Sequence, residues 1–216
     1  MIDPKTLWFD TVDAHTLCRM GANGPKHPSQ LYAVRGYVRQ GENFLDYGSG
    51  SATTLEAIRK ELPDLKLNYL GVDIVPKFTE WCQKHFPDSK FEVNPSLHKI
   101  DQPDRSWDVV YSRHVVDHME SFEGAMEEHL RVAKRLVIVV LWVPFNNGDE
   151  HQIKHIIDQG KVYKDEYTNC YSKKKVMEYL DNKKTEGWNL LMFAEDVGAE
   201  VRGHDTVIVL ERRHAE

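Results

Sequence analysis

The sequence predicts a single α/β domain built on a doubly wound, mostly parallel sheet. Seven apolar runs of strand length recur along the chain, and segments with a helical spacing of apolar residues separate most of them. Runs such as VIVVLWV are apolar on both faces, which is typical of strands that helices cover on both sides. The 216 residues are enough for one domain with a buried core, so we treat residues 1–216 as one unit.

The expected strands are short and regularly separated. RLVIVVLWV, the fifth, is the most apolar of them. Strands that alternate with helices in this way are typical of a doubly wound sheet with helices on both faces. The seven strands are expected at residues 43–47, 67–72, 90–93, 107–112, 135–143, 189–195 and 206–211.

Four helices are expected between these strands, at residues 51–62, 76–86, 122–132 and 173–184. Pro63 stops the first of them, because proline cannot continue a helix. Pro76 stands at the start of the second, where its fixed φ is favourable. Ser172 is the expected N-cap of the last.

Two segments lie outside this alternation of strands and helices. Residues 1–42 precede the first core strand and are expected to form an N-terminal helical cap. Residues 145–171 form an insertion after the fifth strand. Within it, His151 and His155 are four residues apart and are expected to share one face of a helix. We expect both segments to lie near the ligand-binding edge of the domain.

Composition argues against several classes of partner. The formal net charge of −6 does not suit a nucleic-acid binder, and the basic run at residues 173–175 is interpreted as a solvated helix face. No run approaches the ~20 apolar residues of a membrane helix, and no secretory signal is recognisable. Cys18, Cys82 and Cys170 form no CxxC pair. We therefore expect a cytoplasmic protein with no nucleic-acid or membrane partner.

The stretch NFLDYGSGSATTLEAI, residues 43–58, predicts a ligand-binding loop between a strand and a helix. Gly48 and Gly50 allow the backbone to turn sharply and approach a ligand closely. A dinucleotide loop favours GxGxxG, but Thr53 occupies the third glycine position. Asp46 would also repel a pyrophosphate, whereas it suits a ligand with a positive charge.

A second acid, Asp73, ends the next strand in LGVDIV. A carboxylate at this place can accept hydrogen bonds from both hydroxyl groups of a ribose. The following Ile74 supplies an apolar surface for a base. Asp73 fits NAD and adenosyl ligands alike, and the loop that contains Asp46 favours the adenosyl ligand.

Three motifs, FLDYGSGSA, YLGVDIV and SWDVVYSRHVVDHM, resemble the successive motifs of class I S-adenosylmethionine-dependent methyltransferases. The resemblance covers residues 43–143 and extends more loosely over the last two strands. It implies a Rossmann-like, seven-stranded sheet with the last strand antiparallel, and S-adenosylmethionine as the cofactor. It also implies that Asp46, Gly48, Ser49 and Gly50 hold the methionine part and that Asp73, with Ile74, holds the ribose and base.

The chain departs from the family pattern in three places. Ala52 replaces the usual third glycine of the loop, and the segment before the fifth strand lacks a Pro-Gly-Gly turn. The third strand often ends in an acid beside the adenine amino group. Here FEVNPSLH offers Asn94 or Ser96 instead. In the family the end of the fourth strand lies beside the methyl donor, which implies contacts from Ser112 and Arg113.

The YSRH end of the fourth strand does not resemble the motif of DNA amino-methyltransferases, and the acids of the metal-dependent catechol enzymes are missing. We therefore expect no metal. A hydroxyl acceptor needs a base to take its proton, and histidine is the commonest choice. His114 is the first candidate and His118 the second.

The expected acceptor is a small molecule or a glycan-type hydroxyl, and the insertion is expected to line its pocket. By likeness to small-molecule methyltransferases, the pocket residues would be His151, Tyr167, Asn169 and Tyr171. Three alternatives stay open: a protein or peptide acceptor, a non-catalytic adenosyl-binding subunit that activates a partner, and an NAD-dependent oxidoreductase.

Overall fold

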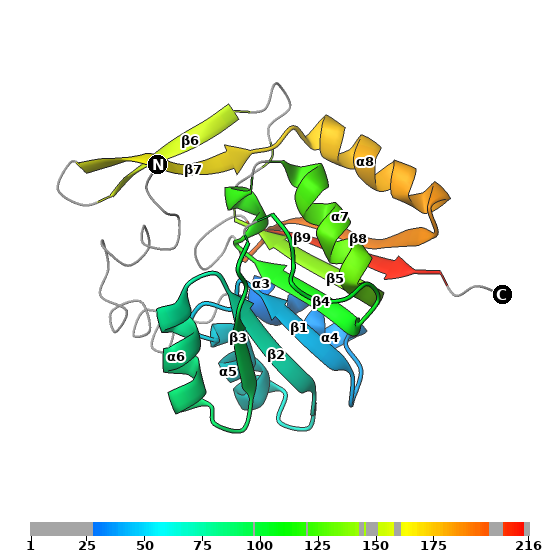
Figure 1. Ribbon diagram of the computed structural model, residues 1–216. Helices are drawn as coiled ribbons and strands as arrows, with labels where there is room; N and C mark the ends of the chain where they lie inside the picture. The colour runs from blue at the N-terminus through cyan, green and yellow to red at the C-terminus, as the bar shows by residue number, and fades with distance from the viewer. Residues whose placement is uncertain are drawn as a thin grey trace.

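A computed structural model describes residues 28–96, 98–119, 121–142, 145, 151–157, 161–198 and 205–213, with the backbone alone for 151–157 and 161–168. Its main feature is a seven-stranded sheet with the order β3-β2-β1-β4-β5-β9-β8 (Figure 1). The strands are β1 (Asn43–Tyr47), β2 (Asn68–Asp73), β3 (Lys90–Val93), β4 (Trp107–Arg113), β5 (Ala133–Leu141), β8 (Trp188–Val197) and β9 (Asp205–Arg212).

The pairing of these strands confirms the predicted fold class. Neighbouring strands from β3 through β5 are parallel, whereas β9 is antiparallel to both β5 and β8. The strand order reverses at β1, which pairs with β2 on one side and β4 on the other. Ligands of open α/β sheets bind at such a reversal, beyond the carboxyl ends of the strands.

Helices cover both faces of the sheet, as predicted. One core contains Met126 and Leu130 of α7 together with Leu180 of α8, and the other contains Leu55 of α5 and Cys82 of α6. The helices are α3 (Ser29–Tyr32), α4 (Val34–Tyr37), α5 (Thr53–Glu61), α6 (Pro76–His85), α7 (Phe122–Val132) and α8 (Lys173–Thr185), with a 3₁₀ turn η1 (Val116–His118).

Local sequence accounts for most element boundaries. The Ser121 hydroxyl accepts a hydrogen bond from the Gly124 N–H at 3.0 Å and so caps α7. Ser172 stands at the predicted N-cap of α8, but its side chain makes no capping hydrogen bond. β5 begins at Ala133 rather than at residue 135, so it follows α7 directly.

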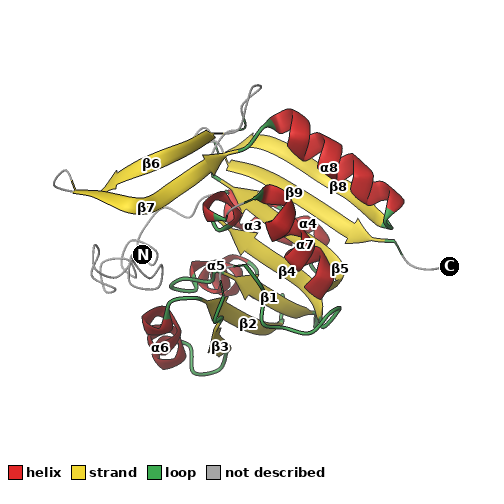
Figure 2. Cartoon of the chain, turned by 45° about the horizontal axis from the view of Figure 1, so that its top comes forward, coloured by secondary structure: helices red, strands yellow, loops and turns green. Residues whose placement is uncertain are grey.

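The insertion forms a second, two-stranded antiparallel sheet (Figure 2), made of β6 (His151–Ile157) and β7 (Lys161–Cys170). The expectation that His151 and His155 share a helix face is therefore wrong. HQIKHII and KVYKDEYTNC are rich in β-branched and aromatic residues, and a three-residue connection separates them, so a hairpin is favoured.

The predicted N-terminal cap can be compared with the structure only from residue 28 onward, where α3 and α4 lie. The rest of the cap lies outside the described residues. In the part of the chain that the structure describes, no helix has the length and apolarity needed to cross a membrane.

Candidate active site and cofactor site

The loop after β1 lies at the carboxyl edge of the sheet and requires glycine at a specific position. Gly48 has a φ of +73°, and a Cβ atom there would lie 2.2 Å from Val115 Cγ2. Gly50 has a φ of +50°, and a Cβ atom there would meet nothing within 4 Å. Gly48 therefore packs against the protein, whereas Gly50 faces open space in which a ligand can lie.

The N–H groups of this loop donate hydrogen bonds inside the protein. Those of Gly48 and Ser49 donate to the carbonyl oxygen of Val72, at 2.8 and 3.0 Å. The Gly50 N–H donates to Asp73 Oδ2 at 2.9 Å. Loops that bind phosphates direct such N–H groups at the ligand. The loop therefore does not favour the pyrophosphate of a dinucleotide.

Asp73 joins the end of β2 to the glycine loop. Its Oδ1 accepts the Val75 N–H and its Oδ2 the Gly50 N–H, both at 2.9 Å. Burial raises its pKa to about 6, although these backbone hydrogen bonds act in the opposite direction. A carboxylate has about four lone-pair sites, which is more than these backbone N–H groups use, so it can also accept from a hydroxyl donor. Asp73 thus fits the predicted contact with a ribose.

Asp46 lies beneath the same loop and is almost fully buried, with an exposed fraction of 2%. It accepts a hydrogen bond from the Tyr69 hydroxyl at 2.6 Å. Burial raises its pKa to about 7; the Tyr69 hydrogen bond opposes this and the charge of Asp73 adds to it. A nearby positive charge would stabilise the ionised forms of both acids. The two carboxyl groups therefore fit an adenosyl ligand with a cationic amino acid end.

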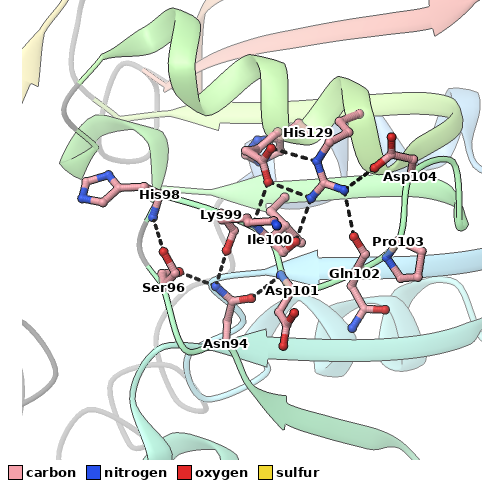
Figure 3. A network of polar contacts seen from close by, with 12 residues as sticks. Asn94, Ser96, His98, Lys99, Ile100, Asp101, Gln102, Pro103, Asp104 and His129 are labelled. Atoms are coloured by element: carbon pink, nitrogen blue, oxygen red, sulfur yellow. Dashed lines mark hydrogen bonds and ion pairs between the residues drawn. The ribbon is translucent and has the colours of Figure 1, made fainter.

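The side chain expected beside the adenine, that of Asn94, is used within its own loop (Figure 3). Its amide nitrogen donates to the carbonyl oxygens of Ser96 and of Lys99, the latter at 2.9 Å, and its Oδ1 accepts the Asp101 N–H at 2.8 Å. The Ser96 hydroxyl accepts the His98 N–H at 3.1 Å. Because its polar side-chain atoms already have partners, Asn94 shapes the loop, and its contact with the adenine stays a prediction.

The expected cofactor contact Ser112 is fully buried, and its side chain belongs to the core. His129 Nδ1 lies 2.7 Å from the Ala125 carbonyl oxygen and therefore carries the proton. Its Nε2 then accepts from the Ser112 hydroxyl, at 2.9 Å. Burial lowers the pKa of His129 to about 4, which keeps the ring neutral. The Ser112 hydroxyl thus binds the end of β4 to His129 of α7.

The first candidate base, His114, follows β4 at the carboxyl edge of the sheet. Its φ of +57° is uncommon for a residue with a side chain and marks a constrained backbone. Its N–H donates to the Val140 carbonyl oxygen at 2.8 Å, and its ring centroid lies 6.3 Å from that of Trp142. His114 Nε2 lies 3.0 Å from Asp205 Oδ2. A carboxylate therefore orients the imidazole.

Asp205 is itself held from several sides. Its Oδ2 accepts the Ser29 hydroxyl at 2.5 Å and lies 3.8 Å from Arg113 Nη2. Burial acts to raise the pKa of Asp205, but the hydrogen bonds and charges of His114, Ser29 and Arg113 outweigh it and lower the pKa. Asp205 is therefore ionised beside His114. Within the described residues, Arg113 Nε is buried and has no hydrogen-bond partner.

Three more of the predicted residues lie in η1 or bind to it. His118 is in η1 and partly exposed. Asn169 and Tyr171, expected in the acceptor pocket, are buried. Asn169 Nδ2 donates to the Met119 carbonyl oxygen, and the Tyr171 hydroxyl donates to that of Val116 at 2.7 Å. Their side chains therefore attach the base of the hairpin to η1. Their role in the acceptor pocket stays a prediction.

Two of the expected acceptor-pocket residues cannot be placed by their side chains. His151 lies on β6 and Tyr167 on β7. Both side chains lie outside the described residues. Of the substrate-binding set, only Asn169 and Tyr171 can thus be compared with the prediction. Ile74 of the cofactor set is half-buried directly after Asp73.

Sequence reasoning missed Asp205, Ser29 and Gln30. Gln30 Nε2 donates to Thr53 Oγ1 at 3.0 Å, so that α3 is joined to the start of α5. Asp205 had a recognisable signal, since it begins the last strand and an antiparallel last strand starts at the carboxyl edge.

In the described ranges, no group of three His, Cys, Asp or Glu side chains is placed to hold a metal ion.

A family model described as a methyltransferase domain matches residues 45–141, from β1 to the end of β5. This part of the chain is a methyltransferase domain. The match covers the glycine loop, Asp73 and His114, and the sheet has the class I methyltransferase topology. The matched part contains Asp46, Gly48, Gly50 and Asp73, which fit the adenosyl and amino acid parts of S-adenosylmethionine.

Solved structures share the fold over nearly the whole chain. The methyltransferase complex with the Trm112 activator from Haloferax volcanii has a TM-score of 0.70 at 16% identity and covers 99% of this chain and 100% of that one. A SAM-dependent methyltransferase from Aquifex aeolicus has a TM-score of 0.57 at 18% identity, with 98% and 100% covered. Identities this low show the fold alone.

Two further similarities bear on what the fold can do. Magnesium protoporphyrin IX methyltransferase from Synechocystis PCC 6803, solved with bound SAH, has a TM-score of 0.58 at 13% identity, with 92% of this chain and 83% of that chain covered. The [4+2]-cyclase SpnF has a TM-score of 0.66 at 14% identity, with 94% and 93% covered. The fold therefore hosts more than one reaction. No curated protein matches the chain.

Proposed function

We propose that this methyltransferase transfers a methyl group to a hydroxyl of a small-molecule or glycan-type acceptor, without a metal ion. The observation that carries the proposal is the His114–Asp205 pair at the end of β4, with 3.0 Å between Nε2 and Oδ2. S-adenosylmethionine supplies an electrophilic methyl group on a sulfonium. A hydroxyl oxygen must be held in line with that group and must lose its proton.

His114 is the proposed general base. A carboxylate only accepts hydrogen bonds, so Nε2 carries the proton that faces Asp205, and Nδ1 is the nitrogen that takes the acceptor's proton. The imidazolium formed in this step is stabilised by the ionised Asp205 carboxylate. Ser29 and Arg113 fix the direction of that carboxylate.

The cofactor contacts of the proposal come from the loop after β1 and from the end of β2. Gly50 leaves room for the ligand, Asp73 accepts the ribose hydroxyls, and Asp46 stabilises the positive charge of the amino acid end. The buried floor of the site excludes water from these carboxylates, which strengthens their interaction with a cation.

Substitution of the pair tests the proposed base. We expect H114A and D205N to lower kcat/KM by about 10²- to 10⁴-fold, because proton removal loses its base or the base loses its orientation. Their affinities for S-adenosylhomocysteine should stay within about twofold of wild type, since neither side chain is placed against the adenosyl part. Formation of S-adenosylhomocysteine over a panel of phenols, alcohols and sugars measures the rate.

The controls for this experiment test three claims separately: that no metal is needed, that His114 is the base, and that the acceptor is a hydroxyl. A chelator is expected to leave the rate of the wild-type enzyme unchanged. H114A with wild-type kcat/KM would overturn the role of His114. Transfer to peptides with none to the hydroxyl panel would assign a protein acceptor instead.

A requirement for an activator protein is a second proposal. It is supported by the Haloferax volcanii structure, which matches this chain from end to end and is a complex of a methyltransferase with the activator Trm112. We expect the chain copurified with an activator protein from its own host to be more active than the isolated chain. Full activity of the isolated chain would contradict this proposal.

A further inference from the structure

The loop that follows β3, residues 94–104, is held by one arginine of α7. All five N–H groups of the Arg131 guanidinium have an acceptor. Two donate to the Glu128 carboxylate, at 2.8 and 2.7 Å. The others donate to the loop itself, to the carbonyl oxygens of Ile100 at 2.8 Å and Gln102 at 3.0 Å and to Asp104 at 2.6 Å.

Glu128 completes the attachment of the loop to α7. Its Oε2 accepts the Ile100 N–H at 2.9 Å, so both backbone groups of Ile100 are bound to the Arg131–Glu128 pair. The Ile100 side chain is 1% exposed and lies in the core beneath α7. The middle of the loop is therefore held in place against α7 by its backbone and by the buried Ile100 side chain.

On its other side, the same part of the loop is bound to Asn94, which directly follows β3 (Figure 3). Asn94 donates to Lys99 and accepts from Asp101, the two residues that flank Ile100. The Asn94 N–H also donates to the Asp73 carbonyl oxygen at 2.8 Å. Hydrogen bonds thus run from α7 through the loop to Asp73, whose carboxylate is bound to Gly50.

We propose that Arg131 is a positioning residue of the cofactor site. It fixes residues 94–96 and 98–101 against the end of β2, so that the adenosyl part of the ligand binds to a surface that is already formed. A preformed surface costs less ordering on binding and therefore gives higher affinity. The inference rests on the proposed placement of the ribose at Asp73.

The test compares two ligands that share the adenosyl part. Calorimetry with adenosine and with S-adenosylhomocysteine is carried out on wild type and on R131K. Lysine keeps the charge but has three N–H donors on one atom in place of the planar fork of five. We expect R131K to weaken both ligands by about fivefold or more and by the same factor, because only the part that they share meets the loop. Backbone hydrogen exchange of residues 94–101 should also become faster.

Arg135 supplies the matched control. It is also held by several hydrogen bonds, to Glu42, Glu211 and the Tyr37 carbonyl oxygen, and it contacts no residue of the 94–104 loop in these bonds. R135K is therefore expected to lower Tm without changing either affinity. A merely structural role of Arg131 would give R131K the same outcome as R135K.

A second variant, E128Q, covers the case in which R131K does not fold. It keeps the shape of the Glu128 side chain and removes the charge that Arg131 binds. We expect E128Q to weaken the binding of both ligands as well. Wild-type affinities in these variants would overturn the positioning role alone. A wild-type enzyme that binds neither ligand would overturn the cofactor placement and this inference together.

Discussion

At the scale of single residues, the two buried carboxyl groups under the loop make stability depend on pH. In the unfolded chain the pKa of Asp46 is near 3.8, whereas in the native protein burial raises this pKa to about 7. Between these values the native state binds more protons than the unfolded state, so the free energy of unfolding falls as pH rises. Asp73, with a pKa raised to about 6, acts in the same direction.

The variant D46N tests this coupling. Its amide cannot ionise, and its Oδ1 can still accept from Tyr69. We expect D46N to unfold at a higher urea concentration than wild type at about pH 8 and at a similar one at about pH 4. D88N is the matched control, because Asp88 is exposed and its pKa is lowered by a hydrogen bond from Arg59. A D46N protein with the wild-type pH dependence would contradict the burial argument.

The sequence allowed residue types to be predicted better than their hydrogen-bond partners. Gly48 and Asp73 were recognisable because the turn and the strand end restrict the residue types that fit there. The role of Asn94 was not, since its partners Lys99 and Asp101 depend on how the following loop folds back. Asp205 was missed because 91 residues separate it from His114, and only the sheet order brings them together.

At the scale of elements, the hairpin is attached to the domain through its base. The Tyr171 hydroxyl donates to the Val116 carbonyl oxygen, and the ring packs against Phe122 with centroids 5.6 Å apart. We expect Y171F to lower the free energy of unfolding by about 1–3 kcal/mol, because a buried carbonyl loses its donor. Urea denaturation measures this change. The KM for an acceptor should not change, and a raised KM with unchanged stability would instead support the predicted role of Tyr171 in the acceptor pocket.

Element types were predictable wherever the period of the apolar residues was clear. Each of the seven predicted strands exists, and the four predicted helices lie within about two residues of their expected bounds. The hairpin was not predicted, because HQIKHII was interpreted through the spacing of its two histidines rather than through its β-branched residues. For a short run, i and i+4 positions do not distinguish a helix from a strand.

At the scale of the whole molecule, the fold and the reaction are separate questions. The sheet order and helix layers are shared with methyltransferases and with a cyclase. The assignment of the cofactor therefore depends on the carboxyl edge, where the glycine loop, Asp46 and Asp73 meet. The assignment of the acceptor depends on His114 and Asp205 at the same edge, where β4 ends and β9 begins.

Titration calorimetry with S-adenosylhomocysteine on wild type, G50A and G41A is the most direct test of the cofactor site. Gly50 and Gly41 both have positive φ and open space around a Cβ atom, but they lie at opposite ends of β1. Alanine costs each about 1–2 kcal/mol of strain. We predict tight binding by wild type and G41A and a loss of about tenfold or more in G50A. No binding by wild type, or equal affinity in all three, would contradict the account.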